Sequence, residues 1–237
     1  NKVGQRKIEK ENQYPLLEKG FTADDIMRGI EVLLSRKITM SDITKKFEHY
    51  FSKFVGSKYS LMVNSGSSAN LLAAHALINP KKKRRLKAGD KFIIPAICWS
   101  TSLWPLIQCG LKPQFLDVNI NNYCLDEKLL KKNKNVKAIM NIHILGNSPD
   151  MDKLTDFVKS NNMYLIEDTC EALGSKFKSK HLGTFGDFGT YSFYYSHQIT
   201  SGEGGMIVCK TKEDYELLHT MRAHGWDRGL RNTKKKK

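Results

Sequence analysis

Hydrophobic residues near the beginning of the chain recur at the spacing of three and four that is typical of an amphipathic helix. One such series covers residues 26–34, and Thr22 with Asp25 forms the pattern of a capping box at its start. A second series begins after Ser41 and ends before Gly56, a residue type that commonly terminates helices. Both segments are therefore predicted to be surface helices whose apolar faces pack on a core.

From residue 59 onward, short apolar runs alternate with segments of helical periodicity. The runs predicted as strands are residues 59–63, 91–95, 114–118, 136–144, 163–167, 191–194 and 206–209. The segments predicted as helices are residues 69–77, 100–109, 151–161 and 213–223. Strands separated by helices favour an α/β fold with a mostly parallel sheet and helices on both faces. Ligands bind at the carboxyl ends of strands in such sheets, so the residues after each strand are the candidates for chemistry.

Composition and charge narrow the class of protein. The 237 residues are 40% hydrophobic and 27% charged, which is typical of a globular chain. No run of 18 apolar residues or secretory signal is present, so no membrane partner is predicted. The net charge of +15 would suit a nucleic-acid-binding protein, but the runs 81–85 and 234–237 supply nine of these charges. The first run is predicted to be a solvated loop, and no nucleic-acid partner is expected.

The cysteines indicate the redox state of the protein. There are five, and their spacing contains no C-x-x-C pair: Cys98, Cys109, Cys124, Cys170 and Cys209. This pattern supports neither a disulfide framework nor a zinc site. We therefore expect reduced thiols in a cytoplasmic protein, and no bound metal.

Three segments that follow predicted strands carry residues suited to chemistry. Gly66, Ser67 and Ser68 begin a helix, where they could bind a phosphate or simply cap the helix. Asp168 ends a buried strand, either as a helix cap or as the partner of a cationic ring nitrogen. His197 lies in a segment rich in aromatic, serine and glycine residues, either as a hydrogen-bonded core residue or as a proton-transfer group. For each of the three segments, the residues alone leave both alternatives open.

Six motifs, taken in order, resemble the DegT/DnrJ/EryC1/StrS family. They read NSGSSANL, PAICWST, IHILGN, IEDTCEALGS, GTFGDFGTYSF and SHQITSGEGG. The resemblance covers residues 14–230 and implies the large domain of a fold type I, pyridoxal phosphate-dependent transferase, with a seven-stranded type of sheet. Residues 1–13 are then an N-terminal arm and residues 231–237 a basic tail, while the family's small C-terminal domain is absent from this sequence. Because family active sites form between two subunits, a homodimer is expected.

The resemblance also assigns residues to the cofactor, pyridoxal 5′-phosphate or its pyridoxamine form. These are Gly66, Ser67, Ser68, Trp99, Asp168, Glu171 and Ser192. The three serines match positions that hold the phosphate, and Trp99 matches the residue that stacks on the ring. Asp168 matches the carboxylate that keeps the ring nitrogen protonated. Glu171 stands beside the ring hydroxyl, where relatives often carry glutamine.

His197 departs from the ordinary members of the family, which are aminotransferases with a lysine at this position that bonds to the cofactor. The replacement, with Glu203-Gly204-Gly205 following, resembles the sugar 3-dehydratase branch of the GDP-4-keto-6-deoxy-D-mannose 3-dehydratase type. It implies removal of the C3 hydroxyl of a nucleotide-linked 4-keto-6-deoxyhexose in deoxysugar and lipopolysaccharide biosynthesis. His197 would be the catalytic residue and glutamate the amino donor.

Other interpretations stay open at this point. No cysteine follows Cys209, so the iron–sulfur cluster of a second dehydratase type is not expected. A nucleotide-sugar aminotransferase in which His197 takes the place of the lysine is one alternative. An inactive, shortened relative is another.

Overall fold

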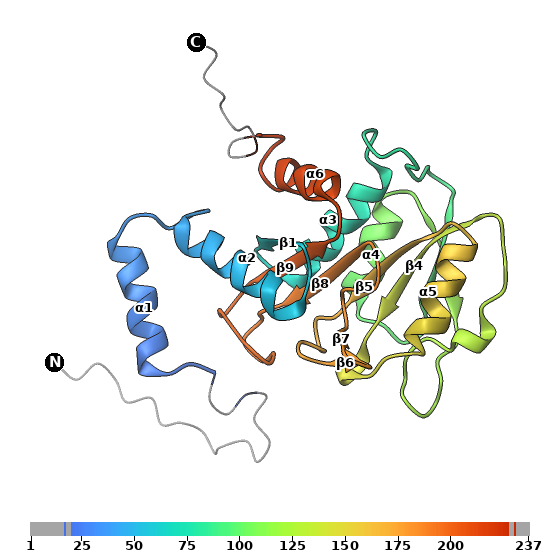
Figure 1. Ribbon diagram of the computed structural model, residues 1–237, viewed down its shortest axis with the longest axis horizontal. Coiled ribbons are helices and arrows are strands. Elements are labelled where there is room, and N and C mark those ends of the chain that lie inside the picture. The colour runs from blue at the N-terminus through green and yellow to red at the C-terminus, as the bar shows by residue number, and fades with distance from the viewer. Residues whose placement is uncertain (1–16, 18–19, 228–229, 231–237) are drawn as a thin grey trace, which may run out of the picture.

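A seven-stranded sheet forms the centre of the protein, in a computed structural model that describes residue 17, residues 20–227 and residue 230 (Figure 1). In spatial order its strands are β1 (Tyr59–Val63), β9 (Gly205–Cys209), β8 (Phe188–Ser192), β5 (Tyr164–Asp168), β4 (Val136–Ile142), β2 (Lys91–Pro95) and β3 (Lys112–Leu116). β9 runs antiparallel to both neighbours, and all other neighbouring strands are parallel. The predicted mostly parallel α/β sheet is confirmed.

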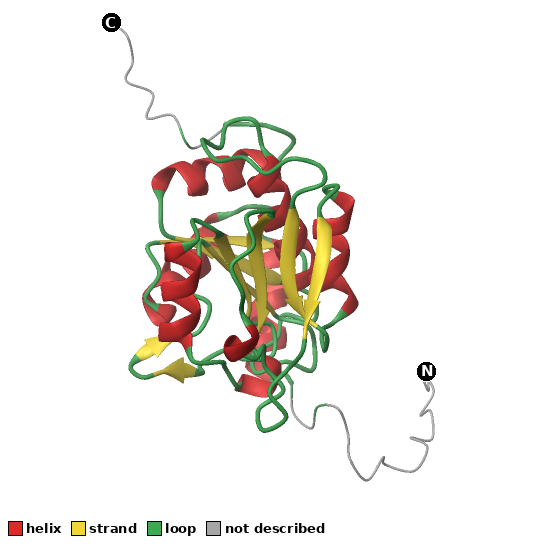
Figure 2. Ribbon diagram, turned by 90° about the vertical axis from the view of Figure 1, so that its right-hand side faces the viewer, coloured by secondary structure: helices red, strands yellow, loops and turns green. Residues whose placement is uncertain are grey.

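Helices cover both faces of this sheet (Figure 2). The covering helices are α2 (Asp42–Val55), α3 (Gly66–Ile78), α4 (Ser100–Gln108), α5 (Met151–Ser160) and α6 (Lys212–Arg222), while α1 (Ala23–Leu34) precedes them in the chain. α3, α4 and α6 share one apolar cluster with one face of the sheet, while α5 and α2 pack in separate clusters with the other. Successive side chains of β5 point to opposite faces of the sheet. Ile166 therefore belongs to the apolar cluster on the first face and Leu165 to a cluster on the second.

The first two helices form where the pattern predicts them. The Thr22 hydroxyl accepts from the Asp25 amide at 3.2 Å, and the Asp25 carboxylate accepts from the Thr22 amide at 2.8 Å, which confirms the capping box. Gly56 adopts the left-handed conformation, φ 73°, at the end of α2. Ser41 precedes α2, but its side chain makes no capping hydrogen bond.

The predicted packing of α1 on the core is wrong. None of its residues is buried, and Ile26 and Leu34 are 57% and 77% exposed. Figure 1 shows α1 standing apart from the sheet. The capping box and the helical spacing are local features, so they predict the helix without identifying what covers its apolar face. In the described part of the chain, no segment covers it.

Several boundaries differ from the prediction. β3 lies two residues earlier than expected, and β8 begins at Phe188 instead of residue 191. Gly189 hides the start of β8 in the sequence, because glycine disfavours strands. The structure requires it, since a Cβ atom there would lie 1.9 Å from the Gly183 carbonyl oxygen. The short strands β6 (Lys176–Phe177) and β7 (Lys180–His181) were not predicted, because two residues show no periodicity.

The basic run at 81–85 is not simply a solvated loop. Lys82 pairs with Asp214 in α6, and its ammonium lies 5.1 Å from the centre of the Tyr164 ring. The Arg84 guanidinium lies 4.4 Å from the same ring. Two of the five positive charges therefore hold the connection after α3 against β5 and α6. The second run, in residues 231–237, and the arm at residues 1–13 lie outside the described residues.

Other sequence expectations concern cysteines and membranes. All five cysteines have free thiols, as predicted. Among the helices that the structure describes, none is long and apolar enough to cross a membrane. The same residues contain no group of three or more histidine, cysteine or acidic side chains that could hold a metal ion.

Candidate active site

Asp168 is the buried acidic residue at the carboxyl edge of the sheet. It ends β5 and is 6% exposed. Its Oδ1 accepts a hydrogen bond from the Cys170 amide at 3.1 Å. Its Oδ2 accepts from Asn70 Nδ2 at 2.8 Å and from Ser102 Oγ at 2.7 Å. Asp168 therefore holds the turn after β5 and also faces α3 and α4, so a capping role alone does not describe it.

The amino end of α3 lies directly against this turn and against the end of β8. Ser65 caps the helix by accepting from the Ser68 amide at 3.1 Å. A Cβ atom on Gly66 would lie 2.6 Å from Cys170 Sγ and 2.8 Å from Ser192 Cβ, so only glycine fits. The first-turn amides of a helix have no partner within it and favour an anion. Gly66 and Ser192, both predicted phosphate contacts, are thus neighbours.

Ser67 connects α3 with α4, and Trp99 lies directly before α4. Ser67 Oγ donates to Thr101 Oγ1 at 2.9 Å, which joins the first turns of the two helices. Trp99 precedes α4 and is 72% exposed, with its backbone extended. The exposed indole ring of Trp99 at the sheet edge offers a flat apolar surface on which the ring of a ligand can stack.

His197 lies in the turn that follows β8. Its amide donates to the Tyr194 carbonyl at 3.0 Å, and its ring packs edge-on against the Tyr194 ring at 6.0 Å between centres. Its Nδ1 is buried and has no hydrogen-bond partner among the described residues. A core histidine held by two hydrogen bonds does not match this geometry. The side chain is half-buried, and no described residue fixes which of its two ring nitrogens carries the proton.

Glu171 links the His197 turn to the end of β4. Its carbonyl accepts from Gln198 Nε2 at 2.7 Å, next to His197 in the chain. Its exposed carboxylate accepts from the Leu145 amide at 3.3 Å. The structure therefore brings together the segments that carry Gly66, Asp168 and His197, although none of the described hydrogen bonds or ring contacts joins the His197 ring to Asp168 or Trp99.

Two cysteines lie in the same region and are poor nucleophiles. Burial, and next the negative charge of Asp168, raises the pKa of the Cys170 thiol well above its ordinary range. The same two causes raise the pKa of Cys98. Both thiols stay protonated near neutral pH, so neither supplies the thiolate that nucleophilic catalysis requires.

A second buried carboxylate, Glu167, lies on the opposite face of β5. It accepts from His143 Nε2 at 2.9 Å and from the amides of Gly183, Phe185 and Gly186 at 2.9, 2.7 and 2.6 Å. Complete burial raises the pKa of Glu167, but the hydrogen bonds and the charge of His143 outweigh it and hold the pKa below its ordinary 4.5. This cluster ties the loop before β8 to β4 and β5.

Sequence reasoning missed three polar residues behind Asp168: Asn70 and Ser102, which both donate to its Oδ2, and Thr190, which donates to Asn70. All are buried, and Thr190 Oγ1 donates to Asn70 Oδ1 at 2.6 Å. Asn70 stands in the otherwise apolar stretch ANLLAA of α3. A single amide in such a stretch is a signal, because a buried polar group needs a partner.

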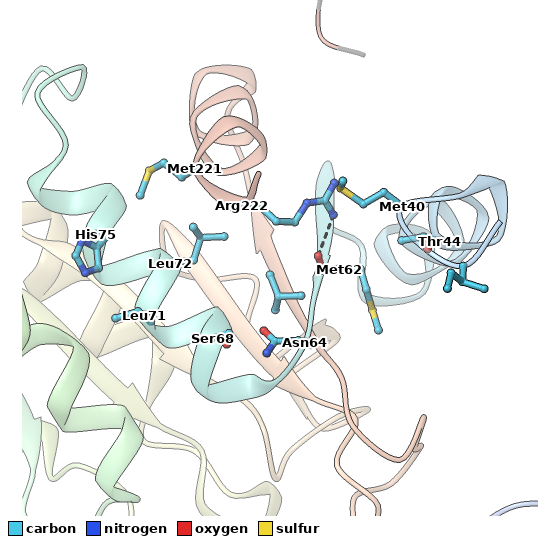
Figure 3. A pocket seen from close by; sticks show the side chains of 12 residues that line it. Met40, Thr44, Met62, Asn64, Ser68, Leu71, Leu72, His75, Met221 and Arg222 are labelled. Atoms are coloured by element: carbon cyan, nitrogen blue, oxygen red, sulfur yellow. Dashed lines mark hydrogen bonds between the residues drawn. The ribbon is translucent and has the colours of Figure 1, made fainter. Parts of the chain in front are cut away.

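A groove of 780 Å³ opens beside the amino end of α3, between α3, α6, β1 and the start of α2 (Figure 3). Leu71, Leu72 and Met62 make its lining largely apolar. Arg222 donates to Glu48 Oε1 at 2.8 Å and to the Met62 carbonyl at 2.9 Å. The groove lies on a side of α3 that does not carry Asn70.

The edge of the sheet fits the cofactor that the motifs imply. Only glycine fits at position 66, next to the amino end of α3, which suits a phosphate. Asp168 suits a cationic ring nitrogen. A seven-stranded, mostly parallel sheet with this polar edge places the protein in the class of fold type I transferases. The chain belongs to the DegT/DnrJ/EryC1/StrS aminotransferase family, whose sequence profile matches residues 21–237.

Several of the proteins similar to this chain belong to one branch of the family, the sugar 3-dehydratases. GDP-4-keto-6-deoxy-D-mannose 3-dehydratase from Escherichia coli O55:H7 is 44% identical over 221 residues, which cover 92% of this chain and 56% of that protein. A variant of GDP-4-keto-6-deoxymannose-3-dehydratase with bound GDP-perosamine superposes with a TM-score of 0.87 at 42% identity, over 92% of this chain and 57% of that chain. The same coverage holds for that dehydratase with a trapped PLP-glutamate geminal diamine, at 41% identity and a TM-score of 0.85. The chain therefore spans little more than half the length of these relatives.

Proposed function

We propose that this chain is the cofactor-binding part of a pyridoxal phosphate-dependent 3-dehydratase. Its substrate would be a GDP-linked 4-keto-6-deoxyhexose in the synthesis of deoxysugars for lipopolysaccharide. The observation that carries the proposal is His197, with its Nδ1 unpartnered among the described residues, in a turn whose sequence from residue 194 to 201 contains no lysine. The dehydratase relatives and the fold support the same function.

Each residue at the sheet edge has a role in this proposal. Pyridoxal phosphate, when bound, supplies an electron sink for loss of the C3 hydroxyl of the sugar. The first turn of α3 and Ser192 hold the phosphate, and Trp99 covers one face of the ring. Asp168 keeps the ring nitrogen protonated by accepting its N–H.

Glu171 and His197 complete the site. The Glu171 carboxylate would orient the ring hydroxyl of the bound cofactor. His197 would hold and move the proton between the cofactor and the departing C3 hydroxyl, which is the role of a general acid–base group. A lysine bonded to the cofactor would compete with the amino group that glutamate supplies.

An absorption experiment tests the cofactor and amino-donor half of this function. Purified chain with pyridoxal phosphate is expected to lose its aldehyde band when glutamate is added, without any sugar present. Addition of the GDP-linked keto sugar is then expected to yield a 3-deoxy-4-keto sugar and ammonia. An amino sugar as the product would favour the aminotransferase alternative, and failure to bind pyridoxal phosphate would contradict the proposal.

We also propose that the protein is a homodimer in the cytoplasm. The exposed apolar residues of α1 and the apolar groove support pairing with a second copy, because such surfaces are rarely left in water. The five free thiols support a reducing compartment. Light scattering of the purified chain measures its mass, and a monomer at micromolar concentration would contradict the dimer.

A further inference from the structure

The two carboxylate oxygens of Asp168 accept different numbers of hydrogen bonds. A carboxylate has about four acceptor positions, two on each oxygen. Oδ2 accepts from both Asn70 and Ser102, whereas Oδ1 accepts only from the Cys170 amide. Oδ2 is therefore saturated, and one position on Oδ1 is open to a further donor.

Asn70 is held in a single orientation by its neighbours. Because an ionised carboxylate only accepts, the amide must present Nδ2 to Asp168. Its Oδ1 then accepts from the Thr190 hydroxyl at 2.6 Å, while Nδ2 also donates to the Thr101 carbonyl at 3.3 Å. The amide thus connects α3 with β8, α4 and β5, and its burial excludes water as a substitute partner.

We propose that Asn70 is a positioning residue: with Ser102 it saturates Oδ2 of Asp168, so that Oδ1 presents the one remaining acceptor position to a cationic N–H of the ligand. This inference rests on the proposed function, in which the ligand is pyridoxal phosphate. A charge-assisted hydrogen bond from the ring nitrogen to this open position would be stronger than a hydrogen bond between neutral groups. Without Asn70 the carboxylate can rotate, and its free acceptor no longer has a fixed direction.

The test compares two probes that differ at the ring nitrogen. One is pyridoxal phosphate, and the other is its analogue with a C–H group in place of that nitrogen. Asn70→Leu is expected to weaken binding of pyridoxal phosphate to the cofactor-free chain about tenfold to a hundredfold, because it removes a donor to a charged acceptor. The affinity for the analogue is expected to stay the same, since the analogue does not use Asp168. Calorimetry or fluorescence quenching measures both constants.

Two further variants make the experiment decisive. Ser102→Ala removes the other donor to Oδ2 with a smaller change in volume. It is also expected to weaken binding of pyridoxal phosphate while leaving the affinity for the analogue unchanged. Asn79→Leu, at the opposite end of α3, is the matched control and is expected to change neither affinity. Its Nδ2 lies 3.5 Å from the Met221 sulfur, outside the network around Asp168.

The outcomes separate the inference from the function on which it rests. Equal losses for both probes in Asn70→Leu and Ser102→Ala would mean a general structural role and would overturn the inference. Unchanged affinity for pyridoxal phosphate in both variants would also overturn it, while leaving the proposed function intact. If the unaltered chain bound neither probe, both proposals would fall.

Discussion

Replacing His197 by asparagine is expected to lower the rate of sugar dehydration by about 10²–10⁴-fold, which is the contribution of a general acid–base group. Asparagine is similar in size and polar, but it cannot take up and release a proton. Because the described contacts of His197 are a backbone hydrogen bond and a ring contact with Tyr194, the turn should keep its shape. Binding of pyridoxal phosphate should therefore change little. Steady-state assays of the product and a cofactor titration measure the two effects.

A control and a contrary result can be stated for this prediction. His49→Asn changes an exposed histidine of α2 that lines neither the groove nor the sheet edge, and it is expected to leave turnover unchanged. Unchanged turnover in His197→Asn would contradict the catalytic assignment. A parallel loss of cofactor binding would assign His197 a role in holding the cofactor instead.

Lysine at the same position provides a separate prediction. The His197→Lys chain is expected to form a covalent bond with pyridoxal phosphate that borohydride reduces to a stable adduct, because lysine has the primary amine that histidine lacks. Mass spectrometry of the reduced protein detects the added cofactor. An adduct in the unaltered chain would show that another residue bonds to the cofactor.

The position of Asp168 at the sheet edge could be predicted from the sequence, because a short apolar run directly precedes it. Its partners could not. Asn70 and Asp168 are 98 positions apart, and the topology of the sheet alone brings them together. The isolated amide in an apolar helix indicates a buried partner, but it does not say which one. Periodicity therefore predicts where a polar group lies better than it predicts what that group contacts.

The first helix also shows that local sequence patterns predict an element better than they predict its contacts. The capping box of Thr22 and Asp25 and the end of α2 at Gly56 depend on neighbours in the chain, and both predictions are confirmed. What covers the apolar face of α1 depends on distant surfaces, and that prediction is wrong. The role of His197 also needed a comparison beyond its own segment, since the residues alone left a core histidine equally open.

The other large expected effect concerns stability and the buried cluster around Glu167. Glu167→Gln is expected to lower the free energy of unfolding by about 1–3 kcal/mol, the usual cost of leaving buried hydrogen-bond donors without their acceptor. The carboxylate accepts four hydrogen bonds, from His143 and from the amides of Gly183, Phe185 and Gly186. A glutamine would place its own N–H₂ group against some of these donors and could not accept all four hydrogen bonds. Urea unfolding of the two chains near neutral pH measures the difference.

The dependence on pH identifies the carboxylate as the cause. Because the pKa of Glu167 in the folded chain lies below its ordinary 4.5, its contribution is complete above that pH and is lost as the pH falls through the lowered value. The difference between the two chains is therefore expected to be constant above pH 4.5 and to shrink below it. Glu216→Gln is the matched control, since Glu216 pairs with Lys212 on the exposed side of α6, and its cost should stay below about 1 kcal/mol. A cost for Glu167→Gln as small as that of the control would show that the cluster does not hold the loop before β8. A large difference that did not shrink in acid would assign the loss to packing instead of charge.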